Sequence, residues 1–63
     1  MANEEQLAIL RQGVEVWNKW REENLGIKIE LDFARLDGTN LRGANLSGAD
    51  LRRAELNGTV LFQ

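Results

Sequence analysis

The chain has 63 residues, with ten acidic and eight basic side chains and a net charge of −2. A chain of this length predicts a single domain, residues 1–63, and below about 70–80 residues one core seldom supplies more than about 3–5 kcal/mol of net stability. Because the sequence has no cysteine and no histidine, it excludes disulfides, thiolate zinc sites and imidazole chemistry, and we expect neither a metal nor a cofactor.

The charges are spread evenly along the chain. Residues 1–28 carry five acids and four bases, and so do residues 29–63. This balance argues against a nucleic-acid-binding surface, which would gather lysine and arginine. The longest apolar run, Leu7 to Leu10, is too short for a membrane span or the core of a signal peptide. We therefore expect a cytoplasmic protein that binds neither nucleic acid nor membrane.

The N-terminal segment, residues 1–26, predicts one amphipathic helix over residues 3 to 24. Its apolar residues recur at steps of three and four, with two more widening the stripe: Leu7, Leu10, Val14, Trp17 and Trp20, then Ile9 and Val16. Such a stripe is typical of a helix that covers a core. Gly13 is the awkward residue within it, costing up to about 1 kcal/mol, and we interpret it as a close approach to a neighbouring backbone.

Both ends of this helix carry signals. Asn3 is a suitable N-cap, and Gln6, three residues later, fits the reciprocal bond of a capping box. Gly26 suits the left-handed conformation that closes a helix. After it, residues 27–31 alternate apolar and polar side chains as a strand with one buried face does.

From Leu31 onward leucine recurs at every fifth position. Two residues before each leucine lies a small or β-branched residue, and two residues after it is usually glycine. The predicted core ladder is Leu31, Leu36, Leu41, Leu46, Leu51, Leu56 and Leu61, with Ala34, Thr39, Ala44, Ala49, Ala54 and Thr59. A period of five fits neither a helix nor a simple strand, so each repeat predicts a short extended piece followed by a turn.

Four repeats to a turn of the chain would place each residue beneath the one twenty positions later, at about the 4.8 Å spacing of strands. Residues of the same type then stack on one another, since Leu31 lies over Leu51 and Ala34 over Ala54. The pattern predicts a β-solenoid with leucines at the centre and glycine at the corners. Arg53 replaces glycine in one repeat, so that corner must tolerate a side chain.

The blocks at residues 39–43, 44–48 and 49–53 resemble the A(D/N)LxX signature of pentapeptide-repeat proteins, and the resemblance covers residues 29 to 63. Residues 10–20 resemble the N-terminal capping helix of cyanobacterial members. The resemblance implies a right-handed quadrilateral parallel β-helix of just under two coils over residues 27–63, capped by one N-terminal α-helix. Known members usually have several coils, so this array is short.

A short array predicts an open edge. Only residues 29–43 have a partner twenty positions later, so the last coil has nothing beneath it. Unpaired backbone groups at such an edge are a template for another chain. We expect a homodimer through this C-terminal face, formed by Leu46, Leu51, Leu56, Leu61 and Phe62.

The last four residues, Val60 to Gln63, allow two interpretations. They fit the repeat register, and they also resemble what a rhinovirus-type processing protease leaves after cutting behind Leu-Phe-Gln to remove a tag. The first interpretation makes them native sequence, and the second makes them a scar.

The candidate site residues have structural explanations. We interpret Leu10, Val14, Trp17 and Trp20 as the part of the helix that caps the core, rather than as ligand-stacking residues. For Phe33, at a corner, partial burial and a partner contact are both open.

The polar groups of the repeats give no sign of catalysis. Glu30 and Asp32, or Asp37 and Asp50, are paired carboxylates on outward positions beside arginines, which predicts a solvated wall. The polar residue before a leucine, as in Asn40, Asn45 and Asp50, is expected to hydrogen-bond the local turn.

The sequence favours a non-enzymatic structural or protein-interaction module that self-associates through its last coil. The family resemblance supplies an alternative, a DNA mimic that inhibits or protects a type II topoisomerase. That function needs a long acidic rod, whereas this array is short and its acids alternate with arginines. A further alternative is a minimal engineered fragment made to study repeat folding and assembly.

Overall fold

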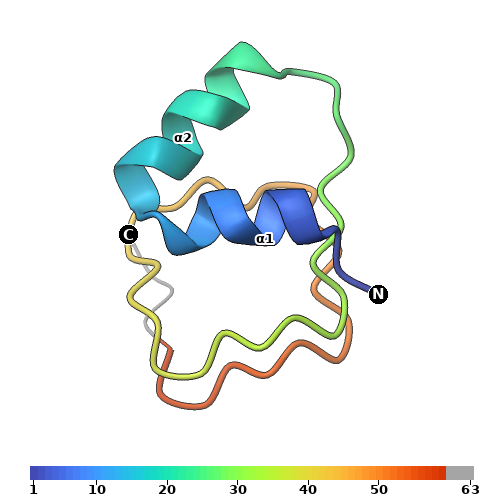
Figure 1. Cartoon of the computed structure of the whole chain (residues 1–63), viewed down its shortest axis with the longest axis vertical. Helices are drawn as coiled ribbons and strands as arrows, with labels where there is room; N and C mark the ends of the chain where they lie inside the picture. The colour runs from blue at the N-terminus through green and yellow to red at the C-terminus, as the bar shows by residue number, and fades with distance from the viewer. Residues whose placement is uncertain (60–63) are drawn as a thin grey trace.

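The N-terminal segment forms two helices in the computed structural model, which describes residues 1–59 (Figure 1). Helix α1 spans Glu4–Arg11 and helix α2 spans Val14–Glu23. The single helix predicted over residues 3 to 24 is therefore wrong. The chain breaks at Gly13, whose φ of 119° and ψ of 162° lie in a region that is open to glycine and closed to almost every other residue.

Gly13 is needed for its backbone conformation and not for space. A Cβ built on it would meet nothing within 4 Å, so the predicted close approach to another backbone is wrong as well. Its N–H donates to Leu10 O at 3.1 Å, and its carbonyl accepts from Trp17 N at 3.0 Å. One residue thus ends α1 and begins α2.

Replacing Gly13 by alanine is expected to destabilise the fold by about 1–3 kcal/mol, because alanine is strained in this conformation. Urea unfolding followed by circular dichroism measures the loss. The neighbouring Gln12→Ala is the matched control, since Gln12 is exposed and already has helical dihedral angles. Equal stability of the two variants would contradict the expectation.

The start of α1 carries only half of the predicted capping box. Asn3 Oδ1 accepts from Gln6 N at 3.0 Å, as an N-cap should. The Gln6 side chain does not return to Asn3 N, which donates instead to Glu30 O at 2.8 Å. At the other end of the helical segment Gly26 has the predicted positive φ, 92°.

After Gly26 the described chain runs as short extended pieces and turns, with two isolated parallel bridges in place of continuous strands. The bridges pair Glu30 with Asp50 and Arg35 with Glu55. In the first, Leu31 N donates to Asp50 O at 2.9 Å, which gives the pairing its register. Both bridges join residues twenty positions apart, the offset that the leucine period predicts. We call this repeat region the coil; its first pass runs over residues 29–48 and its second pass over residues 49–59. Figure 1 shows the two passes lying side by side along the lower edge of the view.

The six described repeats that begin the turn at Leu31 through Leu56 turn in the same way. In each, the N–H three residues after the leucine donates to that leucine's carbonyl, as in Ala34 to Leu31 and Ala54 to Leu51, at 3.1 and 3.0 Å. The residue two after the leucine has a positive φ, between 59° and 80°, at six consecutive repeats: Phe33, Gly38, Gly43, Gly48, Arg53 and Gly58. A β-turn with a left-handed third residue favours glycine. Phe33 and Arg53 occupy this position at a cost of about 1–2 kcal/mol each.

The core lies between the helices and the first pass of the coil. Its fully buried members are Leu10, Trp17, Ile29, Leu31, Ala34, Leu36, Leu41 and Ala44. Of the predicted helix stripe, Leu7, Ile9, Val14 and Trp20 are partly buried against this core. The prediction for Val16 is wrong, because its side chain is 43% exposed on the outer side of α2.

Candidate interaction surfaces

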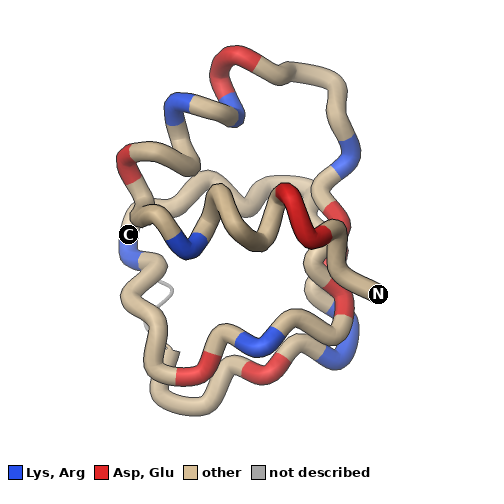
Figure 2. Tube along the Cα trace, viewed as in Figure 1, with Lys and Arg blue, Asp and Glu red and all other residues tan. Residues whose placement is uncertain are grey.

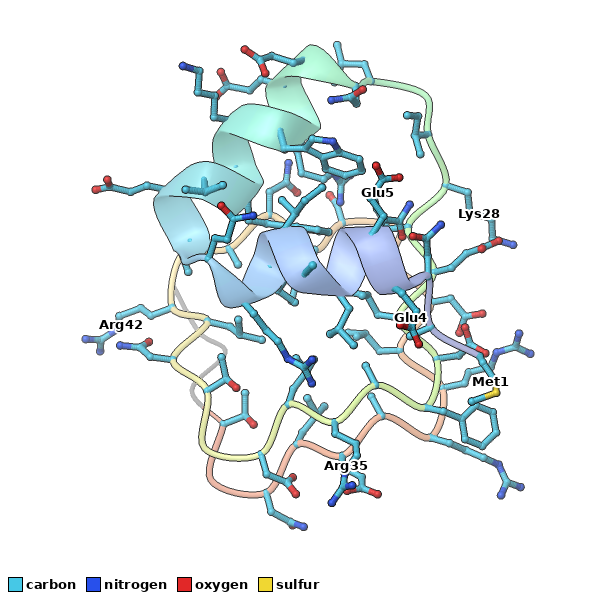
Figure 3. All side chains as sticks on the ribbon, in the orientation of Figure 1. Met1, Glu4, Glu5, Lys28, Arg35 and Arg42 are labelled. Carbon is cyan, nitrogen blue, oxygen red and sulfur yellow. The ribbon has the colours of Figure 1, made fainter. Side chains whose placement is uncertain are left out.

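The end of the coil that faces α1 and α2, which we call the upper end, is closed by side chains of these helices. Gln6, only 4% exposed, accepts from Glu30 N at 2.8 Å and donates to Lys28 O at 2.9 Å. In Figure 3 Lys28 lies beside the N-terminal end of α1. A side-chain amide that accepts from one backbone N–H and donates to a nearby carbonyl does what a peptide group of a neighbouring strand would do.

Asn18 of α2 repeats this arrangement fifteen residues further along the coil. It accepts from Asn45 N at 2.7 Å and donates to Gly43 O at 3.0 Å. Trp17 Nε1 and the Arg21 guanidinium also donate to Asn45 O, at 2.9 and 3.0 Å. The helices therefore satisfy the upward-facing backbone groups of the coil as well as covering its leucines.

The opposite end of the coil presents a second surface, which we call the lower face. It is formed by Leu46, Ala49, Leu51, Ala54 and Leu56. All five are only partly buried, and all but Ala54 pack against the core, whereas Leu31 and Leu36, directly above Leu51 and Leu56, are 0% exposed. Burial of the leucines thus falls with distance from the helices. Leu61 and Phe62 lie outside the described residues.

The lower face also carries backbone groups that find no partner in the described part of the chain. Along the first pass of the coil, Leu31 N and Leu36 N each donate to the second pass, at 2.9 Å. Twenty positions later, Leu51 N and Leu56 N find no acceptor within residues 1–59. The same holds for four further groups, which are the N–H of Arg53 and Gly58 and the carbonyls of Ala49 and Ala54. The lower face is therefore an apolar surface lined with backbone donors and acceptors.

The remaining ladder residues are placed as follows. Ala34 and Ala44 are buried, while Thr39 and Thr59 are partly buried. The Thr59 hydroxyl donates to Leu36 O, which ties the second pass of the coil to the first.

The outer walls of the coil are polar, with opposite charges close together (Figure 2). Asn40, Asn45 and Asp50 each accept from the N–H two residues later, at 3.1–3.2 Å, which confirms their predicted turn bonds. Hydrogen bonds from the Arg52 side chain and its N–H lower the pKa of Asp50 to about 2. Arg35 Nε lies 3.5 Å from Glu55 Oε1 on the pass below.

The carboxylates considered as pairs have separate partners. Asp50 is held by Arg52, and Asp32 Oδ2 lies 2.8 Å from the Met1 amino nitrogen. Asp37 accepts from Asn57 N at 2.8 Å. Within the described residues no three carboxylates gather as metal ligands would, and no helix among them is long and apolar enough to cross a bilayer.

Comparison with known proteins gives one match. Residues 29–63, more than half of the chain, match the family model described as pentapeptide repeats (8 copies). Comparison with the curated proteins and with the solved structures gives no match.

Proposed function

Because the chain belongs to the pentapeptide-repeat family, we propose that it is a non-enzymatic interaction module whose repeats wind as a short right-handed quadrilateral β-helix. In this proposal two copies associate through the lower face. The twenty-residue offset of the bridges supports the winding, since it equals four repeats of five residues. The single observation that carries the association is the row of backbone groups along an apolar face that have no partner among residues 1–59.

A second copy suits this face because it offers the same surface. Backbone donors that would otherwise lie unpaired favour an occupant with carbonyls in a matching row, and the lower face carries both donors and acceptors. Leu51 and Leu56 of one copy would cover those of the other. Burying about 100 Å² of leucine surface contributes about 2.5 kcal/mol.

The helices determine the orientation of the pair. The backbone of the upper edge is already bonded to Gln6, Asn18 and Arg21, so a second copy cannot stack on that end. Two lower faces must therefore meet, related by a two-fold axis that gives an isologous dimer. That axis reverses the direction of the chain, so the coils at the interface would pair in antiparallel fashion, unlike the parallel pairing within each copy.

Sedimentation equilibrium of the 63-residue chain tests this association. We expect a dimer of 7.2 kDa protomers, and a melting temperature that rises with protein concentration because dissociation accompanies unfolding. Leu51→Lys should shift the chain to a folded monomer, and Lys19→Ala, on the exposed side of α2, is the matched control.

The concentration dependence of the wild-type melting temperature needs no variant, so it tests the association of two copies even if Leu51→Lys fails to fold. A folded 7.2 kDa species at high micromolar concentration, with a melting temperature independent of concentration, would refute the association. It would leave the winding of the coil untouched.

A further inference from the structure

We propose that the corner built by Phe33 and Arg53 binds an acidic segment of a partner protein, in which a carboxylate side chain adjoins an apolar one. Phe33 lies on the first pass of the coil and Arg53 twenty residues later on the second. Phe33 is 52% exposed, and the Arg53 guanidinium carbon lies 6.0 Å from its ring centroid. The two side chains lie on the wall of the coil; the Arg53 N–H belongs to the edge of the lower face, whereas Phe33 lies one pass away from that face.

Phe33 stands between two depressions of different character. One, of about 240 Å³, is lined by Asp32, Phe33, Arg52 and Arg53. The other, of about 260 Å³, is lined in part by Ala2, Leu7 and Phe33, under the start of α1. Met1, at the rim of the second depression, is labelled in Figure 3. An apolar side chain fits the second depression, and a carboxylate beside it would reach the first.

The charges around the corner favour a negative occupant. Asp50 engages the Arg52 guanidinium through bonds of 3.0 and 2.9 Å, so this cation is already neutralised. Arg53 makes no ion pair with any residue of 1–59; its interaction there is with the Phe33 ring. An arginine stacked on an aromatic ring with its donors free is well suited to binding a carboxylate.

Asp32 is the acid that faces the same depression, and its carboxylate is 2.8 Å from the Met1 amino nitrogen. Arg11 adds a second cation at the far rim, where its guanidinium donates to Arg35 O at 3.1 Å. Glu4 is the acid that lines the second depression, where Arg11 and Arg35 also lie, so arginines outnumber acids at both depressions.

The backbone conformation of this corner is an independent observation that favours a binding role. Phe33 and Arg53 occupy the left-handed position that glycine fills at the other described corners, with φ of 66° and 59°. Both side chains are exposed, so neither adds much to the core in return for this strain. Strained residues that do not serve packing often mark binding sites.

Nuclear magnetic resonance titration with the peptide acetyl-Gly-Leu-Glu-Gly-amide tests the proposal. We expect saturable shifts at the Phe33 and Arg53 amides, with a dissociation constant of about 1 mM, as fits so small a probe. The matching peptide with glutamine in place of glutamate should bind at least about tenfold more weakly if the charged hydrogen bond matters. The Phe33 amide, which donates to Arg52 O within the chain, reports on the corner whether or not the chain dimerises.

Arg53→Gly and Phe33→Gly are suitable variants because glycine adopts the left-handed conformation of this turn without steric strain. Each should keep or raise the melting temperature and weaken binding of the glutamate peptide at least about fivefold, as expected for loss of a charge-assisted or aromatic contact. Lys19→Ala removes a charge from the far side of α2 and should leave binding unchanged.

Any one of four results would overturn the proposal. The first is the absence of saturable shifts with the glutamate peptide at about 10 mM, well above the expected constant. The second is equal binding of the glutamate and glutamine peptides, and the third is undiminished binding by Arg53→Gly. Shifts confined to the amides of Leu51 and Leu56 would place the peptide on the lower face instead, which also contradicts the proposal.

Discussion

Replacing Trp17 by alanine is expected to unfold the protein at room temperature, with a loss of about 3–5 kcal/mol. The indole is 0% exposed, and its Nε1 donates to Asn45 O at 2.9 Å. Its ring also packs on Trp20, with centroids 5.4 Å apart and planes inclined at 31°. A core in a chain of this length supplies only about 3–5 kcal/mol in total, so one such loss removes most of the stability.

Circular dichroism with urea titration measures this loss, and two variants separate its causes. Trp17→Phe keeps most of the packing but removes the N–H donor; since Arg21 still donates to Asn45 O, we expect a cost of only about 1–2 kcal/mol. Trp20→Ala should also cost less than Trp17→Ala, because Trp20 is only partly buried. If Trp17→Ala unfolded cooperatively and lost no more than Trp20→Ala, the central place of Trp17 in the core would be contradicted.

The offset between the two passes of the coil could be predicted because the repeat has a strict period. A leucine at every fifth position leaves few ways to bury all of them, and stacking at twenty residues places Leu31 on Leu51. The bridge between Glu30 and Asp50 has that offset. The positive φ at the corners could be predicted too, since glycine recurs there, and Arg53 adopts the conformation despite its side chain.

The break between α1 and α2 could not be predicted from periodicity. Leu10, Val14 and Trp17 keep helical spacing across Gly13, so one long helix and two shorter ones bury the same stripe. A glycine inside a helix costs only about 1 kcal/mol, which is too little to decide between them. In the structure the two helices reach backbone groups on different parts of the coil, Glu30 through α1 and Asn45 through α2, and these partners are not visible in the periodicity.

The hydrogen bonds that the side-chain amides of Gln6 and Asn18 make with the backbone of the coil were not predicted either, although their spacing carries a signal. Gln6 precedes Leu10 by four residues and so lies on the apolar stripe itself, where a polar side chain must find partners if it is buried. We expected it to cap its own helix. Its partners, Lys28 O and Glu30 N, are far along the chain, and nothing in a single sequence links them to residue 6. Asn18 follows Val14 by four residues and so carries the same signal, although it is only partly buried.

Gln6→Met is expected to destabilise the fold by about 2–4 kcal/mol, because it leaves one donor and one acceptor without partners. Methionine has nearly the same length and volume, so the change tests the hydrogen bonds and not the packing. Asn18→Ala removes the same pair of bonds at a more exposed place, where water can replace them, and should cost about 0.5–1.5 kcal/mol. Equal losses by urea unfolding would show that the burial of Gln6 does not matter.

Gln6→Glu extends this test with a pH dependence whose sign follows from the geometry. One carboxyl oxygen can accept from Glu30 N, but the other faces Lys28 O, itself an acceptor. Only the protonated form donates there, so the fold should raise the pKa of the introduced carboxyl above its ordinary value of about 4.3. A raised pKa stabilises the variant below the ordinary value, and this stability is lost as pH rises through the folded-state pKa.

The free energy of unfolding that Gln6→Glu loses relative to the wild type should therefore be small at pH 4 and larger at pH 7. The increase should be about 1–2 kcal/mol for each unit by which the fold raises the pKa of the introduced carboxyl. Asp50, whose pKa is lowered to about 2 by Arg52, is ionised at both pH values, and the other native carboxylates are common to the two proteins, so the comparison isolates the introduced carboxyl. Urea unfolding of both proteins at the two pH values gives the difference. A gap that stayed constant, or widened at pH 4, would contradict the double hydrogen bond of Gln6 as the contact that joins α1 to the coil.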